Sequence, residues 1–160
     1  MIQIREYTEK DREEILSLMQ EFCEYVEGID PLKLVQYKEK SAEFYTELML
    51  KKNSENGKIY TATDGDSVVG FIGGHVSMQD EDEQMELVQM IPGHITDFFV
   101  TKSYRGQKIG QTLMNKIESF FKENNVTIVR LEVFAPNEIA RAFYNKYGFI
   151  ERLITVSKLV

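Results

Sequence analysis

Cysteine, tryptophan and proline are scarce in this chain of 160 residues, which contains one Cys, no Trp and three Pro. The single cysteine, Cys23, excludes an intramolecular disulfide, and its place on the apolar side of an expected helix favours a buried, inert thiol over a nucleophile. No apolar run approaches the ~20 residues that span a bilayer, and residues 1–6 lack the pattern of a secretory signal. We therefore expect a cytoplasmic protein without a membrane partner.

Basic residues are too few for a surface that binds nucleic acid. The chain has 19 Lys and Arg against 26 Asp and Glu, which gives a net charge of −7 at pH 7. Nucleic-acid-binding proteins carry a basic footprint, so no such partner is expected, although an acidic balance is compatible with a cationic substrate. The two histidines, His75 and His94, do not have the spacing of a metal-binding pair, so we expect no metal site.

Length and hydrophobic patterning predict one domain over residues 1–160, of mixed α/β class. Apolar residues recur at helical or strand-like intervals, and Gly, Pro or Asn separates the segments. This pattern predicts helices at about residues 11–27, 36–52, 109–123 and 137–147. It predicts strands at residues 3–6, 58–63, 68–76, 95–100, 126–134 and 149–160.

Local signals refine this outline at three places. The residues Asp64-Gly65-Asp66-Ser67 between two strand-like runs predict a hairpin. Gly70, Gly73 and Gly74 are frequent for a strand, so we expect a bulge or a close approach by another group. The acidic stretch 80–86 indicates a solvated loop, with recognition of a cationic substrate as the alternative.

The other elements are organised around residues 95–117. A β-prone apolar run, 95–100, is followed by a polar loop and then by apolar residues at helical spacing. The first N–H groups of a helix lack intrahelical partners and lie at the positive end of its dipole, so a loop of this kind suits a phosphate. A P-loop is excluded because Gln111 and Thr112 follow Gly110, and the dinucleotide pattern of three glycines is absent.

Two motifs make the chain resemble the GCN5-related N-acetyltransferase (GNAT) family. The family's acetyl-CoA motif is Gln or Arg, two residues, Gly, one residue, then Gly or Ala. Arg105 and Gly110 match its ends, and Lys108 stands in place of the inner Gly. Residues 137–149, with Asn137, Phe143-Tyr144 and Gly148-Phe149, resemble the family's second segment. The resemblance implies a mostly antiparallel sheet of about six to seven strands with about four flanking helices, whose central strands splay apart around acetyl-CoA.

The resemblance also implies roles for individual residues. Tyr144 matches the general acid that protonates the leaving thiolate, with a packing aromatic as the alternative. Asn137 matches a position that contacts the cofactor, and it also suits a plain helix cap. Backbone N–H groups of Phe98, Phe99 and Val100 would hold the pantetheine arm and polarise the thioester carbonyl. The residues that would hold the pyrophosphate are Arg105, Gly106, Gln107, Lys108, Ile109, Gly110 and Gln111.

Neither motif identifies the base that deprotonates the amine. Asp97 on the central strand is the first candidate, Glu132 on the neighbouring strand the second, and His94 the third. The predicted function is transfer of an acetyl group from acetyl-CoA, as co-substrate, to a primary amine by direct attack in a ternary complex. A non-catalytic acyl-CoA sensor on the same fold is the alternative. The acceptor, a small-molecule or peptide amine, stays open, and so does a homodimer through the C-terminal strand.

Overall fold

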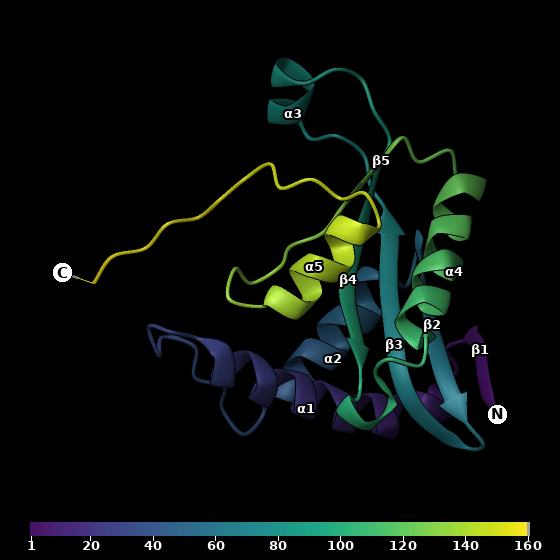
Figure 1. The fold of residues 1–160 in the computed structure, drawn as a ribbon. Coiled ribbons are helices and arrows are strands. Elements are labelled where there is room, and N and C mark those ends of the chain that lie inside the picture. The colour runs from purple at the N-terminus through teal and green to yellow at the C-terminus, as the bar shows by residue number, and fades with distance from the viewer. Residues whose placement is uncertain (160) are drawn as a thin grey trace.

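The computed structural model describes residues 1–159 and places helices on both faces of one twisted sheet (Figure 1). The chain alternates between strands and helices much as the sequence predicts. In order, the elements are β1 (Ile2–Glu6), the 3₁₀ helix η1 (Glu9–Asp11), α1 (Arg12–Ile29), α2 (Ser41–Lys52), β2 (Gly57–Asp64), β3 (Ser67–Val76), α3 (Glu81–Glu86), β4 (Pro92–Val100), the 3₁₀ helix η2 (Lys102–Tyr104), α4 (Ile109–Glu123), β5 (Ile128–Arg130) and α5 (Glu138–Lys146).

The sheet has five strands in the order β1-β2-β3-β4-β5. All neighbours are antiparallel except β4 and β5, which run parallel and are connected through α4, because parallel strands need a crossover. The predicted hairpin joins β2 to β3, with Gly65 in the left-handed conformation at φ 60°. The mixed α/β class is confirmed, and the strand count is five, below the six to seven expected.

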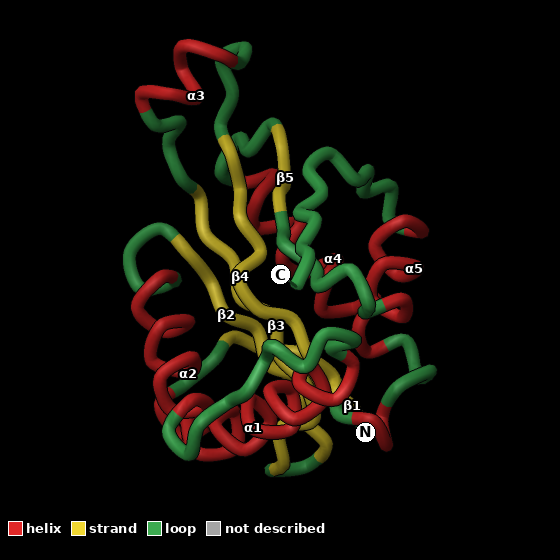
Figure 2. Tube along the Cα trace, turned by 90° about the vertical axis from the view of Figure 1, so that its left-hand side faces the viewer, coloured by secondary structure: helices red, strands yellow, loops and turns green. Residues whose placement is uncertain are grey.

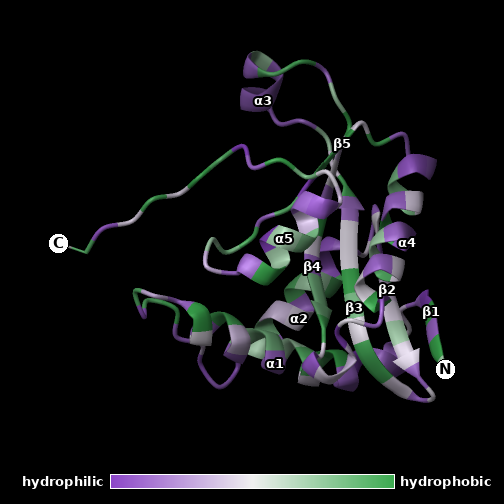
Figure 3. Ribbon diagram, viewed as in Figure 1, coloured by the Kyte–Doolittle hydropathy of each residue, from purple (hydrophilic) through white to green (hydrophobic). Residues whose placement is uncertain are grey.

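Each face of the sheet has its own apolar core. Ile15 and Met19 of α1 pack with Met49 of α2 against Phe71 and Phe99 of the sheet. The other face is covered by α4, and its core residues are Ala62, Val69, Ile72, Ile95, Ile109, Leu113, Met114, Ile117, Phe120 and Phe121. Figure 3 shows both hydrophilic and hydrophobic patches on α4, as expected for a helix with one face in a core. The central strand β4 therefore has a different environment on each face.

Strands β4 and β5 separate soon after they begin. Their pairing covers only Pro92–His94 and Ile128–Arg130, and β4 then continues to Val100 without β5 beside it (Figure 2). The strand predicted over 126–134 is therefore only three residues long. Residues that leave the ladder lose the hydrogen bonds that hold a strand, so a β-prone sequence does not suffice. The result is a gap along the second half of β4.

A bulge in β4 changes which side chains face which core. The pairing passes from Gly74–Ile95 to Gly73–Asp97, so Thr96 is an extra residue. A Cβ on Gly73 would lie 3.0 Å from Thr96 Oγ1, so a larger residue there would require the Thr96 side chain to shift. Ile95 joins the core under α4, whereas Asp97 faces α1 and α2. Simple alternation would have placed both on one face, so the bulge, which the glycines predicted, directs Asp97 to its position.

The segment between α1 and α2 differs from the prediction. Helix α1 continues past Gly28 and ends before Pro31. The Asp30 carboxylate accepts hydrogen bonds from the backbone N–H groups of Leu32, Leu34 and Val35 at 3.0, 2.6 and 2.7 Å. These bonds stabilise a loop, so α2 begins at Ser41 and not near residue 36.

The acidic stretch 80–86 contains the short helix α3, where the sequence indicated a loop. Asp80 is its N-cap and accepts a hydrogen bond from Glu83 N–H at 2.8 Å. All three residues of its first turn, Glu81, Asp82 and Glu83, are acidic, which suits the positive end of a helix. No helix within residues 1–159 combines the length and hydropathy needed to cross a membrane.

The predicted C-terminal strand does not join the sheet. After α5 the chain turns at Gly148, with φ 84°, and residues 150–159 extend away from the body (Figure 1). The side chains in this segment are exposed, including 91% of Leu153 and 88% of Val156. Glu151 is held by an ion pair with Arg141 at 2.6 Å. The sequence is β-prone, but a strand needs a neighbouring edge, and this segment has none among residues 1–159.

Candidate active site

The free edge of β4 presents backbone donors to the gap. Thr101 N–H, just beyond the strand, donates to the Val69 carbonyl of β3 at 3.0 Å. Peptide groups alternate in direction along a strand, so the N–H groups of Phe98 and Val100 point into the gap and that of Phe99 points to β3. Of the three predicted donors, alternation thus leaves Phe98 and Val100 available, while Phe99 contributes a buried ring to the core under α1.

The loop between β4 and α4 directs further N–H groups to one place. Gly106 and Lys108 have positive φ, at 80° and 64°, and Gln107 lies exposed between them. The first α-helical hydrogen bond runs from Thr112 N–H to the Lys108 carbonyl at 3.0 Å. The N–H groups ahead of it, which have no intrahelical acceptor, are those of Ile109, Gly110 and Gln111. Left-handed residues in such a loop form a concave nest, which together with the helix dipole fits a phosphate.

The Arg105 side chain is directed back toward β4. Its Nε donates to the Val100 carbonyl at 2.8 Å, and its guanidinium lies 5.3 Å from the ring centroids of both Tyr25 and Phe99. A guanidinium over two aromatic faces makes a favourable cation–π contact. Arg105 therefore braces the loop, and contact with a phosphate is left to its backbone and its remaining N–H groups.

Side chains of helix α1 form hydrogen bonds with the end of β4 and with the start of α5. Glu21 accepts a hydrogen bond from the Thr101 hydroxyl at 2.7 Å, which fixes the end of β4. The Tyr25 hydroxyl donates to Asn137 Oδ1 at 3.1 Å, and the same oxygen accepts the Ala140 N–H at 3.2 Å. Asn137 is thus the N-cap of α5 and also links α5 to α1.

Tyr144 lies in an aromatic cluster between α5 and β4. Its ring centroid is 6.3 Å from that of Phe98, 5.8 Å from Phe143 and 5.7 Å from Phe149. Burial raises the pKa of Tyr144 to about 12, so the phenol keeps its proton at neutral pH. A Cβ on Gly110 would lie 3.2 Å from the Phe98 ring, so the first turn of α4 packs on the same cluster. This position suits a packing aromatic and also a proton donor beside the gap.

A cavity of about 210 Å³ lies on the opposite face of β4. We call it the Asp97 cavity; its walls come from α1, the segment before α2, α2 itself and β4. Burial raises the pKa of the Asp97 carboxyl, and the Thr96 hydroxyl and the charge of Lys52 offset part of the rise. Burial also raises the pKa of the Cys23 thiol to about 11, with the charge of Asp97 adding to it, so this thiol stays protonated. A carboxylate with a raised pKa in a cavity is a typical general base.

The other two candidates for the base lie outside this cavity. Glu132 is exposed beyond the paired part of β5, and neither it nor His94 is among the described residues that line the Asp97 cavity. His94 stacks on His75 with ring centroids 5.5 Å apart, and burial lowers its pKa, with the charge of Arg130 adding to the effect. The geometry therefore favours Asp97. Within residues 1–159, no group of three or more His, Cys, Asp and Glu side chains is placed to hold a metal ion.

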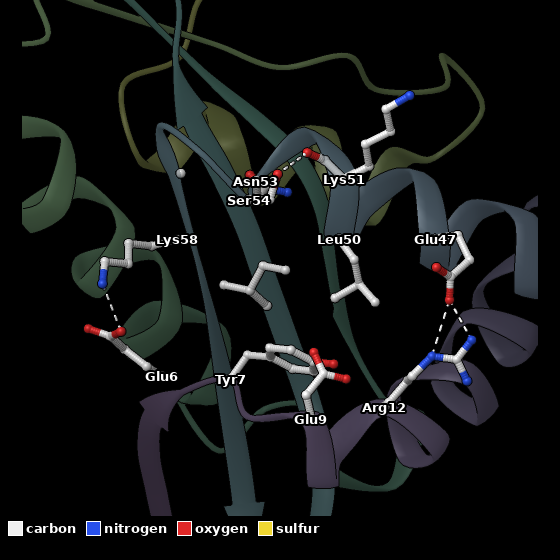
Figure 4. A pocket seen from close by; sticks show the side chains of 12 residues that line it. Glu6, Tyr7, Glu9, Arg12, Glu47, Leu50, Lys51, Asn53, Ser54 and Lys58 are labelled. Carbon is white, nitrogen blue, oxygen red and sulfur yellow. Dashed lines mark hydrogen bonds and ion pairs between the residues drawn. The ribbon is translucent and has the colours of Figure 1, made fainter.

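A larger hollow of about 490 Å³ lies between η1, α2 and β2 (Figure 4). Four of its six charged side chains form ion pairs with each other: Lys58 with Glu6 at 2.8 Å, and Arg12 with Glu47. The described residues that line it include none from β4, α4 or α5. It is therefore separate from the groups assembled around β4.

Sequence reasoning missed the supporting residues and most of the cavity. Tyr25 and Tyr45 fall on the apolar faces of the predicted helices, with no predicted role at a site. Glu21, Tyr37 and Lys52 are not among the predicted site residues. A hydroxyl on an apolar face could have marked Tyr25 as a residue that needs a polar partner. The other four come together only through the packing of α1 and α2 on the sheet, and their spacing in the chain carries no signal of it.

Comparison with known proteins places the chain in a family. A model described as "Acetyltransferase (GNAT) family" matches residues 13–149, which include both motifs and the residues of the Asp97 cavity. The chain therefore belongs to the GNAT acetyltransferase family, whose members are N-acetyltransferases acting on amine acceptors.

Individual relatives agree with this assignment. An uncharacterised N-acetyltransferase of Methanocaldococcus jannaschii is 30% identical over 149 residues, which cover 93% of this chain and 61% of the relative. The chain matches 39% and 40% of the length of two other curated relatives. A solved mutant protein from Bacillus halodurans has the same fold, with a TM-score of 0.85 at 21% identity and 99% coverage of both chains. The AAC(6')-Iy structure, a complex with the bisubstrate analogue CoA-S-monomethyl-acetylneamine, has a TM-score of 0.68 at 14% identity over 100% of this chain and 99% of that one.

Proposed function

We propose that the protein transfers an acetyl group from acetyl-CoA to a primary amine by direct attack in a ternary complex. One observation carries the proposal: a short stretch of β4 serves two sites at once. Phe98 and Val100 direct backbone N–H groups into the gap that leads to α4, and Asp97, next to Phe98, lines a cavity on the other face. An acyl donor in the gap and an amine in the cavity would thus meet at one strand.

The residues around the gap fit acetyl-CoA. The free N–H groups at the start of α4 and the left-handed residues Gly106 and Lys108 would hold its pyrophosphate. The Phe98 and Val100 amides would pair with the pantetheine arm, and one of them would stabilise negative charge on the carbonyl oxygen. When bound, acetyl-CoA supplies an acetyl thioester whose C–S bond is exchanged for a C–N bond, as the amine loses one proton and the sulfur gains one.

One side chain would accept the proton of the amine, and another would donate a proton to the sulfur. Asp97 would accept the proton of the amine, directly or through one water molecule, because its carboxyl lines the cavity and has a raised pKa. Tyr144 would give a proton to the sulfur from the α5 side of the gap. Burial ensures that this phenol is protonated at neutral pH.

The C-terminal segment is the basis of our proposal for a homodimer. Residues 150–159 are exposed and β-prone, and they include Ile150, Leu153, Ile154 and Val156. The last strand of the sheet, β5, has no neighbour on its outer edge within residues 1–159. Exposed strand edges pair readily with extended chains, so we propose that the segment adds to the sheet of a second copy. The cytoplasmic location and the lack of a nucleic-acid partner remain predictions.

Binding and turnover measured together test the enzymatic proposal. We expect acetyl-CoA to bind in calorimetry and to release CoA thiol only when a primary amine is present. A quaternary amine of the same size serves as the control, because it has no free electron pair and cannot be acylated. Binding without amine-dependent release from any primary amine would point to the acyl-CoA sensor, and absence of binding would contradict the cofactor site.

A further inference from the structure

The Asp97 cavity contains one cation and one anion among otherwise uncharged walls. Ten residues line it, and the two charged ones are Lys52 at the end of α2 and Asp97 on β4. Three of the other lining residues are aromatic: Phe22 on α1, Tyr37 and Tyr45. The two tyrosine rings pack edge to face, with centroids 5.7 Å apart. Such a cavity offers an apolar surface with one positive and one negative side chain on its lining.

Neither charge is used elsewhere. Within residues 1–159, Lys52 and Asp97 form no ion pair within 4.0 Å, with each other or with another residue. Lys52 is nevertheless close enough for its charge to act on Asp97 and on both histidines, His75 and His94. Two opposite charges that face one cavity without joining leave room for a molecule that carries both complementary charges.

The charges also argue against a strongly cationic acceptor. An ammonium group beside Asp97 would be stabilised, but further positive charges would meet the Lys52 ammonium. The acidic residues near α3 do not change this, because Glu83 is already paired with Arg130 and none of residues 80–86 lines the cavity. The volume of about 210 Å³ lies below the range of about 300–1,000 Å³ of pockets for drug-sized ligands, so the acceptor is small.

We propose that the acceptor is a small zwitterion, an α-amino acid with an apolar or aromatic side chain. Its amino group would face Asp97, its carboxylate would face Lys52, and its side chain would lie against Phe22, Tyr37 and Tyr45. The inference rests on the acetyl transfer proposed above. In that reaction the ammonium group loses two protons, one to Asp97 and one that replaces, through solvent, the proton Tyr144 gives to the sulfur. The new C–N bond replaces the thioester C–S bond, so the products are the N-acetyl amino acid and CoA thiol.

Matched acceptors with and without a carboxylate test this inference. Thiol release is compared for L-phenylalanine against phenethylamine, for L-leucine against 3-methylbutylamine, and for a dipeptide with N-terminal phenylalanine. We expect kcat/KM to be at least about tenfold higher for each free amino acid than for its decarboxylated partner. Lys52→Met should remove this preference by lowering kcat/KM at least about fivefold more for the amino acids than for the amines. Both classes lose the effect of the Lys52 charge on Asp97, but only the amino acids lose a partner for their carboxylate.

Lys51→Met is the matched control, because Lys51 is the adjacent lysine of α2 and does not line the Asp97 cavity. It should leave the preference unchanged. A thermal shift of the protein without acetyl-CoA gives a second readout: L-phenylalanine should raise the Tm of wild type more than that of Lys52→Met. Equal or faster turnover of the amines or the dipeptide would overturn the amino-acid class while leaving acetyl transfer intact. No thiol release from any acceptor would overturn both proposals.

Discussion

The two sides of β4 differ in the chemical groups that they present. On the side of the gap, the groups that would hold the cofactor are peptide N–H groups, fixed by the strand edge, by the left-handed Gly106 and Lys108, and by the start of α4. On the side of the Asp97 cavity, the groups are side chains from α1, the loop before α2, α2 and β4. A site made of backbone survives most substitutions, whereas a site made of side chains changes with each one. Under the proposed function, the first would therefore set the reaction and the second would select the acceptor.

The largest effect should come from the carboxylate on the cavity side. Asp97→Asn keeps the shape but cannot accept a proton, so we expect kcat to fall by about 10²–10⁴-fold, with the Kd for acetyl-CoA nearly unchanged. Glu132→Gln, on the exposed part of the chain after β5, is the matched control and should stay close to wild type. The same loss in both variants, or a loss in Glu132→Gln alone, would reverse our assignment of the base.

The pH dependence of the same residue follows from its burial. The proposed mechanism requires ionised Asp97, so kcat/KM should fall as the pH drops through its pKa, which lies above the usual value of about 3.9. The free energy of unfolding changes with pH in the opposite direction to kcat/KM. A carboxyl whose pKa is raised in the folded state stabilises that state below the unfolded pKa, and this stabilisation is lost as the pH rises through the folded pKa. At pH 7, Asp97→Asn should therefore have a higher free energy of unfolding than wild type, by ~1.4 kcal/mol per unit of pKa shift. Urea titrations of both proteins measure this difference. Equal stability at pH 7 would contradict the burial of an ionised Asp97.

A smaller effect is expected on the α5 side of the gap. Tyr144→Phe removes the proposed acid but keeps the ring in its aromatic cluster, so kcat should fall by about 10- to 100-fold while the Kd for acetyl-CoA changes little. Tyr147→Phe is the control, because Tyr147 is the next tyrosine at the end of the same helix and stacks on Phe143 at 4.7 Å. If both variants keep wild-type kcat, Tyr144 is only a packing aromatic.

The same contrast explains what the sequence could predict. The loop and the start of α4 are contiguous in the chain, so local patterns were enough to predict the order of strand, loop and helix that the structure has there. The glycines of β3 similarly indicated a bulge, but only the pairing with β4 shows that Thr96 is the extra residue. The Asp97 cavity joins Phe22, Tyr37 and Lys52, which are far apart in the sequence and meet only in the folded chain. The prediction of a C-terminal strand was wrong, because a strand forms only beside a partner edge and the sequence does not reveal such an edge.

Lys108 tests the claim that the cofactor site is made of backbone. A non-glycine residue at φ 64° costs about 1–2 kcal/mol, whereas glycine adopts this conformation freely at some cost in unfolded-state entropy. Lys108→Gly should therefore raise the free energy of unfolding by about 1 kcal/mol, measured in urea. It should weaken acetyl-CoA binding by no more than about fivefold, because an exposed ammonium contributes ~1 kcal/mol or less. Lys108→Ala retains a Cβ and should show no gain in stability; an equal gain would mean that the left-handed backbone is not the cause.

The smallest effect on the folded body should follow removal of the C-terminal segment. A chain ending at Phe149 loses residues 150–160, and those that the structure describes, 150–159, are exposed, so we expect its acetyl-CoA Kd to match that of the full chain. Its mass in solution, measured by light scattering, should fall from dimer to monomer, because the segment proposed to join a second copy is gone. Val156→Lys in the full chain is a milder test, since it puts a charge on the apolar segment without shortening it, and it should weaken the dimer.

These two variants separate the possible uses of the segment. If it added to the β5 edge of its own sheet, truncation would lower the free energy of unfolding by several kcal/mol and the full chain would be a monomer. If it joins a second copy, stability should depend on protein concentration in the full chain and lose that dependence in the truncated one. Because neither the Asp97 cavity nor the loop before α4 includes residues 150–159, both sides of β4 should then work in the monomer as they do in the dimer. A truncated chain that binds acetyl-CoA but no longer turns over would instead mean that the second copy completes the site.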